Sequence, residues 1–157
     1  MYKGEELSLT GELTPELSVF ASGMYLDARQ DSGAPTVTVG TTFMPTTVGK
    51  EIENTARQTY SVATEYRLSR WVQGLSATAG VYFVGPQAVN ALNQAFTGGY
   101  TTYDLGAAYT TDFWGQQFTM RVNGQNITNK RYWASTGGLF LGEGPPAVVR
   151  FSIQTRF

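Results

Sequence analysis

The chain has 157 residues, with 11 basic and 12 acidic side chains and neither cysteine nor histidine. These absences exclude disulfides, zinc fingers, cysteine nucleophiles and Ser-His-Asp triads, and a net charge of -1 argues against a nucleic-acid partner. Charged residues make up 15% of the chain, below the usual value of about 25%, while 18 glycines and 13% aromatic residues indicate an all-β protein of strands and turns.

Seven segments alternate polar and apolar residues with the period of two that is typical of half-exposed β-strands. In chain order they are residues 6–13, 17–27, 55–68, 75–84, 101–110, 117–126 and 147–157. The connections alternate in length: three are short turns, and the long ones, which are predicted to be loops, are 28–54, 85–100 and 127–146. The sequence therefore predicts a seven-stranded antiparallel sheet with long loops at one end and short turns at the other.

The apolar face of these strands can meet either a protein core or lipid, since a soluble sandwich or lipocalin-like barrel alternates in the same way. Three features favour lipid. The segments approach the roughly 9 to 11 residues of a tilted membrane-spanning strand, whereas globular strands average about 5 to 6. Long loops opposite short turns are typical of outer-membrane barrels. Two rows of aromatic residues near the strand ends suit interfacial girdles, namely Tyr25, Tyr60, Phe83 and Tyr103 beside the loops and Tyr66, Tyr109, Phe118 and Phe157 beside the turns.

Seven strands cannot close such a barrel, because bacterial single-chain barrels have even strand numbers and an open sheet leaves two unpaired edges in lipid. We therefore expect the chain to be part of a larger barrel. The opening residues Met1 to Gly4 carry no export signal, so either the protein is cytoplasmic, or Met1 lies inside a longer reading frame as a fragment boundary or an internal start. With Phe157 on the periplasmic side, all the long loops fall outside the cell.

The C-terminal part of the sequence carries a recognisable element. Residues 121–135, RVNGQNITNKRYWAS, resemble the vNNLfDKrYyas element of TonB-dependent outer-membrane receptors, especially ferric-siderophore receptors. Residues 144–153 resemble the start of that family's closing strand, and further similar segments follow in the family's order at 16–21, 25–28, 65–68, 80–85 and 103–106. Asn129 replaces the usual Asp, Gly124-Gln125 interrupts the Asn-Asn-Leu pattern, and Pro146 stands where Arg is common. These departures leave the fold assignment unchanged.

The resemblance implies an antiparallel transmembrane β-barrel of about 22 strands around an N-terminal plug domain. Residues 1–157 would be its last seven strands, without the plug. It further implies a bacterial outer-membrane receptor for TonB-dependent uptake of an iron-siderophore complex, with no catalysis, no metal site and no cofactor other than iron in the bound chelate. The implied partners are the ferric siderophore, TonB through the absent plug region, the barrel-assembly machinery and outer-membrane lipid. The alternative is a small, complete outer-membrane barrel that acts as an adhesin or structural protein.

Two groups of residues are candidates for ligand contact. Aromatic side chains in loops can stack on flat ligand groups, and these are Phe96, Tyr100, Tyr132, Trp133 and Phe140. Alternatively, Tyr132 and Trp133 cap the barrel rim at the level of the lipid headgroups. Charges on the polar, lumen-facing side attract anionic chelates or dock the plug, unless they are solvated or paired with each other; these are Glu65, Arg67, Arg121 and Arg150.

The last predicted strand has a further interpretation. It ends in an aromatic residue after alternating positions, a pattern that resembles the C-terminal signal recognised by barrel-assembly machinery: Val149, Phe151, Ile153, Thr155 and Phe157. Phe157 also suits a simple interfacial anchor, and the two roles are compatible. No catalytic residues are predicted, because the carboxylates show no motif spacing and no histidine is available as a base.

Overall fold

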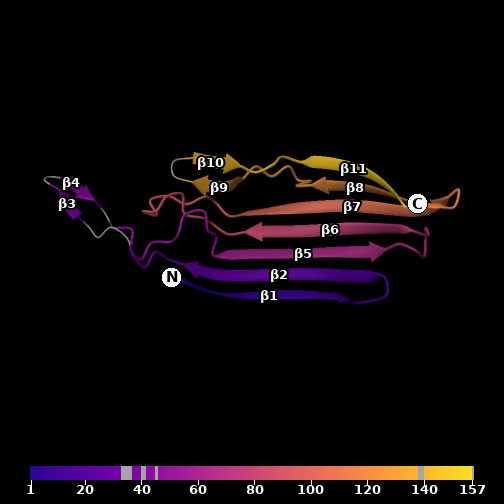
Figure 1. Ribbon diagram of the computed structural model, residues 1–157, viewed down its shortest axis with the longest axis horizontal. Helices are drawn as coiled ribbons and strands as arrows, with labels where there is room; N and C mark the ends of the chain where they lie inside the picture. The colour runs from indigo at the N-terminus through magenta and orange to yellow at the C-terminus, as the bar shows by residue number, and fades with distance from the viewer. Residues whose placement is uncertain (33–36, 40–41, 45, 138–139, 157) are drawn as a thin grey trace.

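A seven-stranded antiparallel sheet forms most of the protein (Figure 1). The computed structural model describes residues 1–32, 37–39, 42–44, 46–137 and 140–156. The strands of the sheet, in spatial order, are β1 (Tyr2–Glu12), β2 (Leu17–Ala28), β5 (Gln58–Arg67), β6 (Leu75–Val84), β7 (Tyr100–Phe113), β8 (Gln116–Gln125) and β11 (Val148–Arg156). The three long loops gather at one end of the sheet, here called the loop end, and the short turns lie at the opposite turn end (Figure 1). In the part of the chain that the structure describes, no helix is long and apolar enough to cross a membrane.

The seven predicted strands are confirmed, with some shifts at their ends. β6 has its predicted bounds, whereas β1 begins at Tyr2 and β7 continues to Phe113. The prediction that 28–54 and 127–146 are simple loops was wrong, because each contains a further hairpin. The first pairs β3 (Val37–Val39) with β4 (Thr42–Met44), and the second pairs β9 (Trp133–Gly137) with β10 (Phe140–Glu143). Strands this short contain too few alternations for a period of two to reveal them.

The turn between β7 and β8 is shorter than the predicted connection 111–116. Only Trp114 and Gly115 separate the two strands, and their φ angles are 51° and 76°. Two consecutive positive φ values are typical of the type I′ hairpin turn, whose twist matches that of the paired strands. Phe113 and Gln116 therefore pair directly, and Trp114 projects from the turn end with 91% of its surface exposed.

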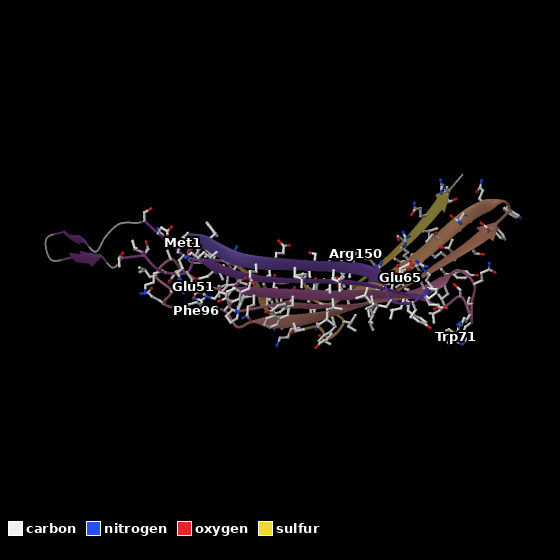
Figure 2. All side chains as sticks on the ribbon, turned by 90° about the horizontal axis from the view of Figure 1, so that it is seen from below. Met1, Glu51, Glu65, Trp71, Phe96 and Arg150 are labelled. Carbon is white, nitrogen blue, oxygen red and sulfur yellow. The ribbon has the colours of Figure 1, made fainter. Side chains whose placement is uncertain are left out.

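The cross-strand register separates an apolar face from a polar face. One row across five strands on the apolar face consists of Leu9, Ala21, Val62, Val81 and Tyr103. A row on the opposite face consists of Glu65, Thr78, Gly106, Asn123 and Arg150. The sheet is twisted and curved (Figure 2), and a groove of about 660 Å³ lies over the polar face. An exposed apolar face behind a grooved polar face is what the wall of a membrane barrel requires.

Candidate ligand-binding site

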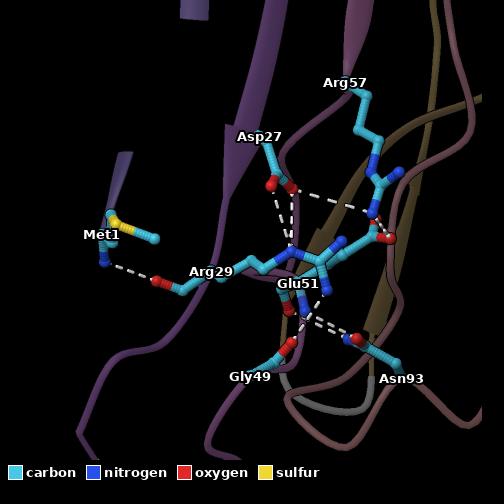
Figure 3. Close-up of polar contacts among 7 residues, drawn as sticks. All are labelled: Met1, Asp27, Arg29, Gly49, Glu51, Arg57 and Asn93. Atoms are coloured by element: carbon cyan, nitrogen blue, oxygen red, sulfur yellow. Dashed lines mark hydrogen bonds and ion pairs between the residues drawn. The ribbon is translucent and has the colours of Figure 1, made fainter. Parts of the chain in front are cut away.

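Paired charges fix the base of the loop between β2 and β5 (Figure 3). The Nε of Arg29 donates to both carboxylate oxygens of Asp27, at 2.9 and 3.1 Å, and this interaction raises the pKa of Arg29 above its usual value. Arg57 lies 2.6 Å from the carboxylate of Glu51 and 3.7 Å from that of Asp27. Asn93 of the next loop donates its side-chain amide to the carbonyl of Glu51. Because the two arginines are matched by two carboxylates, this cluster is suited to holding the loop rather than to binding an anion.

A pocket of about 340 Å³ opens at the loop end, between the start of β7 and the β9–β10 hairpin. It is lined by Gly98, Gly99, Tyr100, Lys130, Arg131, Tyr132, Trp133 and Glu143. The rings of Tyr100 and Tyr132 stack with their centroids 3.9 Å apart and their planes at 26°. The Nε of Arg131 donates to Glu143 at 2.9 Å, which raises the pKa of the guanidinium, and Lys130 is exposed. The pocket thus combines aromatic side chains with the exposed Lys130 and the ion pair of Arg131 with Glu143. Because Glu143 offsets the charge of Arg131, Lys130 supplies the positive charge that suits a planar, negatively charged group.

Two asparagines shape the loop that carries the pocket cations. Asn126 is 3% exposed and has a φ of 47°. Its side chain accepts from the N–H of Lys130 and donates to the Lys130 carbonyl, both at 2.9 Å, and it also donates to the carbonyl of Pro145 at 3.0 Å. Asn129, with a φ of 50°, accepts from the N–H of Ala147 at 3.0 Å. Asparagine tolerates the left-handed conformation better than most residues, so this sequence fastens both ends of the loop beside the sheet.

The structure brings together three of the five predicted loop aromatics. Tyr100, Tyr132 and Trp133 line the pocket. Phe96 lies elsewhere in the loop between β6 and β7, where it forms part of an isolated β-bridge. Phe140, on β10, is 82% exposed and lies outside the pocket. The pocket is therefore built from aromatic residues at the starts of β7 and β9.

Three charged residues of the pocket were missed by the sequence analysis, namely Lys130, Arg131 and Glu143. The two cations directly precede Tyr132 in the recognised element, so their position in the sequence offered a signal. Glu143 offered none, because it meets Arg131 only through the β9–β10 hairpin, in which Glu143 pairs with Trp133.

Two of the predicted lumen charges line the groove on the polar face. Glu65 on β5 and Arg150 on β11 belong to the same cross-strand row and both border the groove (Figure 2). Arg150 donates a hydrogen bond to Gln125 of the neighbouring β8. The negative charge of Glu65 and the positive charge of Arg150 therefore border the groove from two strands that are not neighbours in the sheet, β5 and β11.

The other two lumen charges lie on the same face, nearer the turn end. Arg67 forms an ion pair with Glu12 of β1 at 2.9 Å. Arg121 donates to the side chain of Gln154 on β11 at 3.4 Å. Both arginines thus have partners on other strands of the wall, and Glu65 is not the partner of either in these contacts.

The last strand presents its alternating residues as predicted, as far as the structure describes them. In the cross-strand register, Val149, Phe151, Ile153 and Thr155 lie on the apolar face, opposite Gly124, Val122, Met120 and Phe118 of β8. The aliphatic and aromatic members of this set are exposed. Phe157 lies outside the described residues.

Fold and surface together define the class of protein. A meander of long antiparallel strands with an exposed apolar face, a grooved polar face and long loops at one end only is a segment of an outer-membrane β-barrel. More specifically, the chain belongs to the TonB-dependent receptor-like β-barrel family, whose family model matches residues 2–127. The expected family, the fold class and the location in the bacterial outer membrane are confirmed. Within the described ranges, no group of three or more acidic side chains is placed to hold a metal ion.

Known proteins similar to the chain are much longer than it is. The Ferrichrome receptor FcuA of Yersinia enterocolitica is 29% identical over 157 residues, which cover 99% of this chain and 19% of that receptor. The Metal-pseudopaline receptor CntO of Pseudomonas aeruginosa is 26% identical over 158 residues, which cover 99% of this chain and 20% of that receptor. The chain therefore spans about a fifth of the length of these relatives.

Solved receptor structures have the same arrangement of strands. The siderophore receptor PiuA from Acinetobacter baumannii matches with a TM-score of 0.80 at 20% identity, over 97% of this chain and 21% of that one. BauA, the ferric preacinetobactin receptor of the same organism, matches with a TM-score of 0.80 at 25% identity, over 98% of this chain and 22% of that one. The seven-stranded sheet is thus a partial barrel wall.

Proposed function

We propose that residues 1–157 form the C-terminal strands and extracellular loops of an outer-membrane receptor for TonB-dependent uptake of an iron-siderophore complex. The plug domain and the remaining strands belong to the rest of the receptor. Family membership supports this proposal, and so do relatives whose names describe receptors for ferrichrome and metal-pseudopaline. Since these relatives are about five times as long as the chain, they favour a large receptor over a small, complete adhesin barrel.

The observation that carries the ligand proposal is the stacked pair Tyr100 and Tyr132 beside Lys130 and Arg131. A ferric chelate built from catecholate oxygens offers planar rings and a net negative charge. Aromatic faces stack on the former and cations attract the latter. The pocket lies at the loop end, which in this family's architecture is the extracellular side, so a ligand arriving from the medium meets it first.

We propose a second contact surface for the ligand or the plug in the barrel lumen, at the groove on the polar face. Glu65 and Arg150 border it, and in the complete barrel they would face the plug or a passing chelate. Arg67 and Arg121 are proposed to be wall residues that are held by their partners Glu12 and Gln154. Binding and transport break no covalent bond, so this function asks for no catalytic group and no resident cofactor.

The test measures ligand affinity of the full-length receptor by quenching of intrinsic fluorescence, with ferrichrome and a ferric tris-catecholate as probes. The variants are Tyr132→Ala and the double change Lys130→Ala with Arg131→Ala. We expect each to weaken binding of at least one probe by roughly ten-fold, about 1.4 kcal/mol. Lys50→Ala, at an exposed loop cation outside the pocket, is the control and should bind as the unchanged receptor does. Unchanged affinity of both pocket variants for both probes would contradict the proposed site.

A further inference from the structure

The buried residues of the chain lie mainly in the loops rather than in the sheet. Among the residues whose burial the structure describes, those outside the seven main strands are small or polar, and they are Ala56, Gly85, Gln87, Ala88, Thr97, Asn126, Thr136 and Gly144. They come from all three long loops. Ala88 has no exposed surface at all. Segments of all three loops that lie next to the sheet therefore pack together at the loop end.

One junction among these segments joins all three loops. Asn54, in the loop between β2 and β5, donates its backbone N–H to the carbonyl of Ala88, in the loop between β6 and β7, at 3.1 Å. The side-chain oxygen of Asn54 accepts from the N–H of Thr136, on β9, at 2.8 Å. The hydroxyl of Thr136 donates to the same Ala88 carbonyl at 3.0 Å. Three hydrogen bonds thus close a triangle between segments that lie far apart in the sequence.

The three loops are not joined by equivalent contacts. The first two also meet through Asn93, whose side chain accepts from the N–H of Glu51 at 2.6 Å and donates to the Glu51 carbonyl at 2.9 Å (Figure 3). That pair of bonds does not involve the third loop. Removing the side chain of Asn54 therefore leaves the first two loops joined and releases the contact to Thr136.

Thr136 belongs to the hairpin that carries one side of the ligand pocket. β9 begins at Trp133, and its partner in β10 is Glu143, the residue that pairs with Arg131. We propose that Asn54 is a positioning residue: by holding Thr136 it fixes the β9–β10 hairpin, and through it the pocket, to the other two loops. The three loops then move as one body. The part of this inference that concerns ligand affinity rests on the proposed function, whereas the part that concerns the hairpin rests on the contacts alone.

The conformation of Asn54 allows a sharp choice of variants. Its φ is 56°, a region that glycine and, to a lesser degree, Asn and Asp adopt. Asn54→Gly removes the side-chain oxygen that accepts from Thr136 but still allows the positive φ. Asn54→Asp keeps both the acceptor oxygen and the positive φ. Asn93 has the same φ of 56°, so Asn93→Gly is a matched control that loosens the other contact. Thr136→Val removes only the hydroxyl bond to Ala88.

The experiment places a nitroxide spin label at Phe140→Cys in the full-length receptor and records its mobility by electron paramagnetic resonance. Phe140 is on β10, exposed and outside the pocket. We expect Asn54→Gly to mobilise the label, Asn54→Asp to restore the immobile spectrum, and Thr136→Val to have an intermediate effect. Asn93→Gly should leave this label immobile and mobilise one attached at Lys50→Cys instead.

Ligand affinity supplies the second readout, with ferrichrome and the ferric tris-catecholate as probes. We expect Asn54→Gly to weaken binding roughly five-fold, the effect of one hydrogen bond, and Asn54→Asp to restore it. An immobile label in Asn54→Gly, or equal mobility in Asn54→Gly and Asn54→Asp, would overturn the positioning role. A mobilised label with unchanged affinity would support the contact to the hairpin and overturn its link to ligand binding, while the pocket variants test the proposed function separately.

Discussion

Gly144 donates its backbone N–H to the carbonyl of Tyr132 at 2.9 Å and leaves open the space that the Tyr132 ring fills. A Cβ atom at position 144 would overlap that ring. The absence of a side chain at Gly144 is therefore what lets Tyr132 reach Tyr100 and form the stacked pair of the pocket.

Gly144→Ala should displace the Tyr132 ring and separate it from Tyr100. An aromatic pair contributes about 0.5 to 1.5 kcal/mol beyond its buried area, so probe affinity should fall roughly two- to ten-fold. Gly137→Ala is the control, because a Cβ there meets no atom of the described residues within 4 Å. Fluorescence titration of the full-length receptor with ferrichrome and the ferric tris-catecholate checks the prediction. If both alanine variants bind alike, the stack does not contribute to the site.

Neighbouring residues of β5 should differ sharply in their tolerance of charge. Val62 lies on the apolar face and Ala63 borders the groove on the polar face. Val62→Arg should lower the free energy of unfolding by about 2 to 4 kcal/mol, because it buries a cation in lipid. Ala63→Arg, two residues before Glu65, should cost little. Urea refolding titrations in lipid vesicles measure both free energies, and equal costs would contradict the assignment of the two faces.

The sheet could be predicted from the sequence because the polar and apolar residues of each long strand alternate over many positions. β6 alternates from Leu75 to Gly80 and then ends in an apolar run, Val81 to Val84, and its predicted bounds are those observed. β9 and β10 were missed because their stability comes from outside, through contacts such as Thr136 with Asn54. An 82-residue separation between these two leaves no trace in local periodicity.

The candidate site was predictable only as a set of residue types. Tyr100 and Tyr132 stood out as loop aromatics, but nothing in the sequence indicated that their rings stack. That contact depends on the loop held by Asn126 and on the space at Gly144. Phe140 was predicted on the same grounds, yet it lies outside the pocket. Composition identifies candidates, whereas long-range backbone geometry decides which of them meet.

Trp114 and Trp133 should report different surroundings. Trp114 stacks on Phe113 with centroids 4.7 Å apart, and Phe113 lies edge-on to Phe118, which is on the apolar face at the turn end. Trp133 lines the pocket instead. The emission of each tryptophan is obtained as the difference between the unchanged receptor and its phenylalanine variant, Trp114→Phe or Trp133→Phe. In vesicles with brominated lipid, the emission of Trp114 should therefore be strongly quenched, whereas the emission of Trp133 should not be quenched.

The same measurement decides between the two interpretations of Trp133. A pocket residue should be quenched by added ferric chelate and protected from lipid. If brominated lipid quenches the Trp133 signal as strongly as that of Trp114, then Trp133 caps the rim at the headgroups and is not part of a ligand site. Difference spectra against each phenylalanine variant separate these signals from any other tryptophan in the full-length receptor.

The residue at position 157 should govern how much receptor reaches the outer membrane. Val149, Phe151, Ile153 and Thr155 lie on the apolar face of β11, and alternation places Phe157 next in that series. Replacing it by a polar residue removes the aromatic end of the pattern, so Phe157→Ser should lower the abundance of the full-length receptor in outer-membrane fractions, measured by immunoblot. Arg156→Ser changes the adjacent position, which alternation assigns to the other face, and should leave abundance unchanged. Equal abundance of the two variants would mean that Phe157 serves neither assembly nor anchoring, because either role requires the ring.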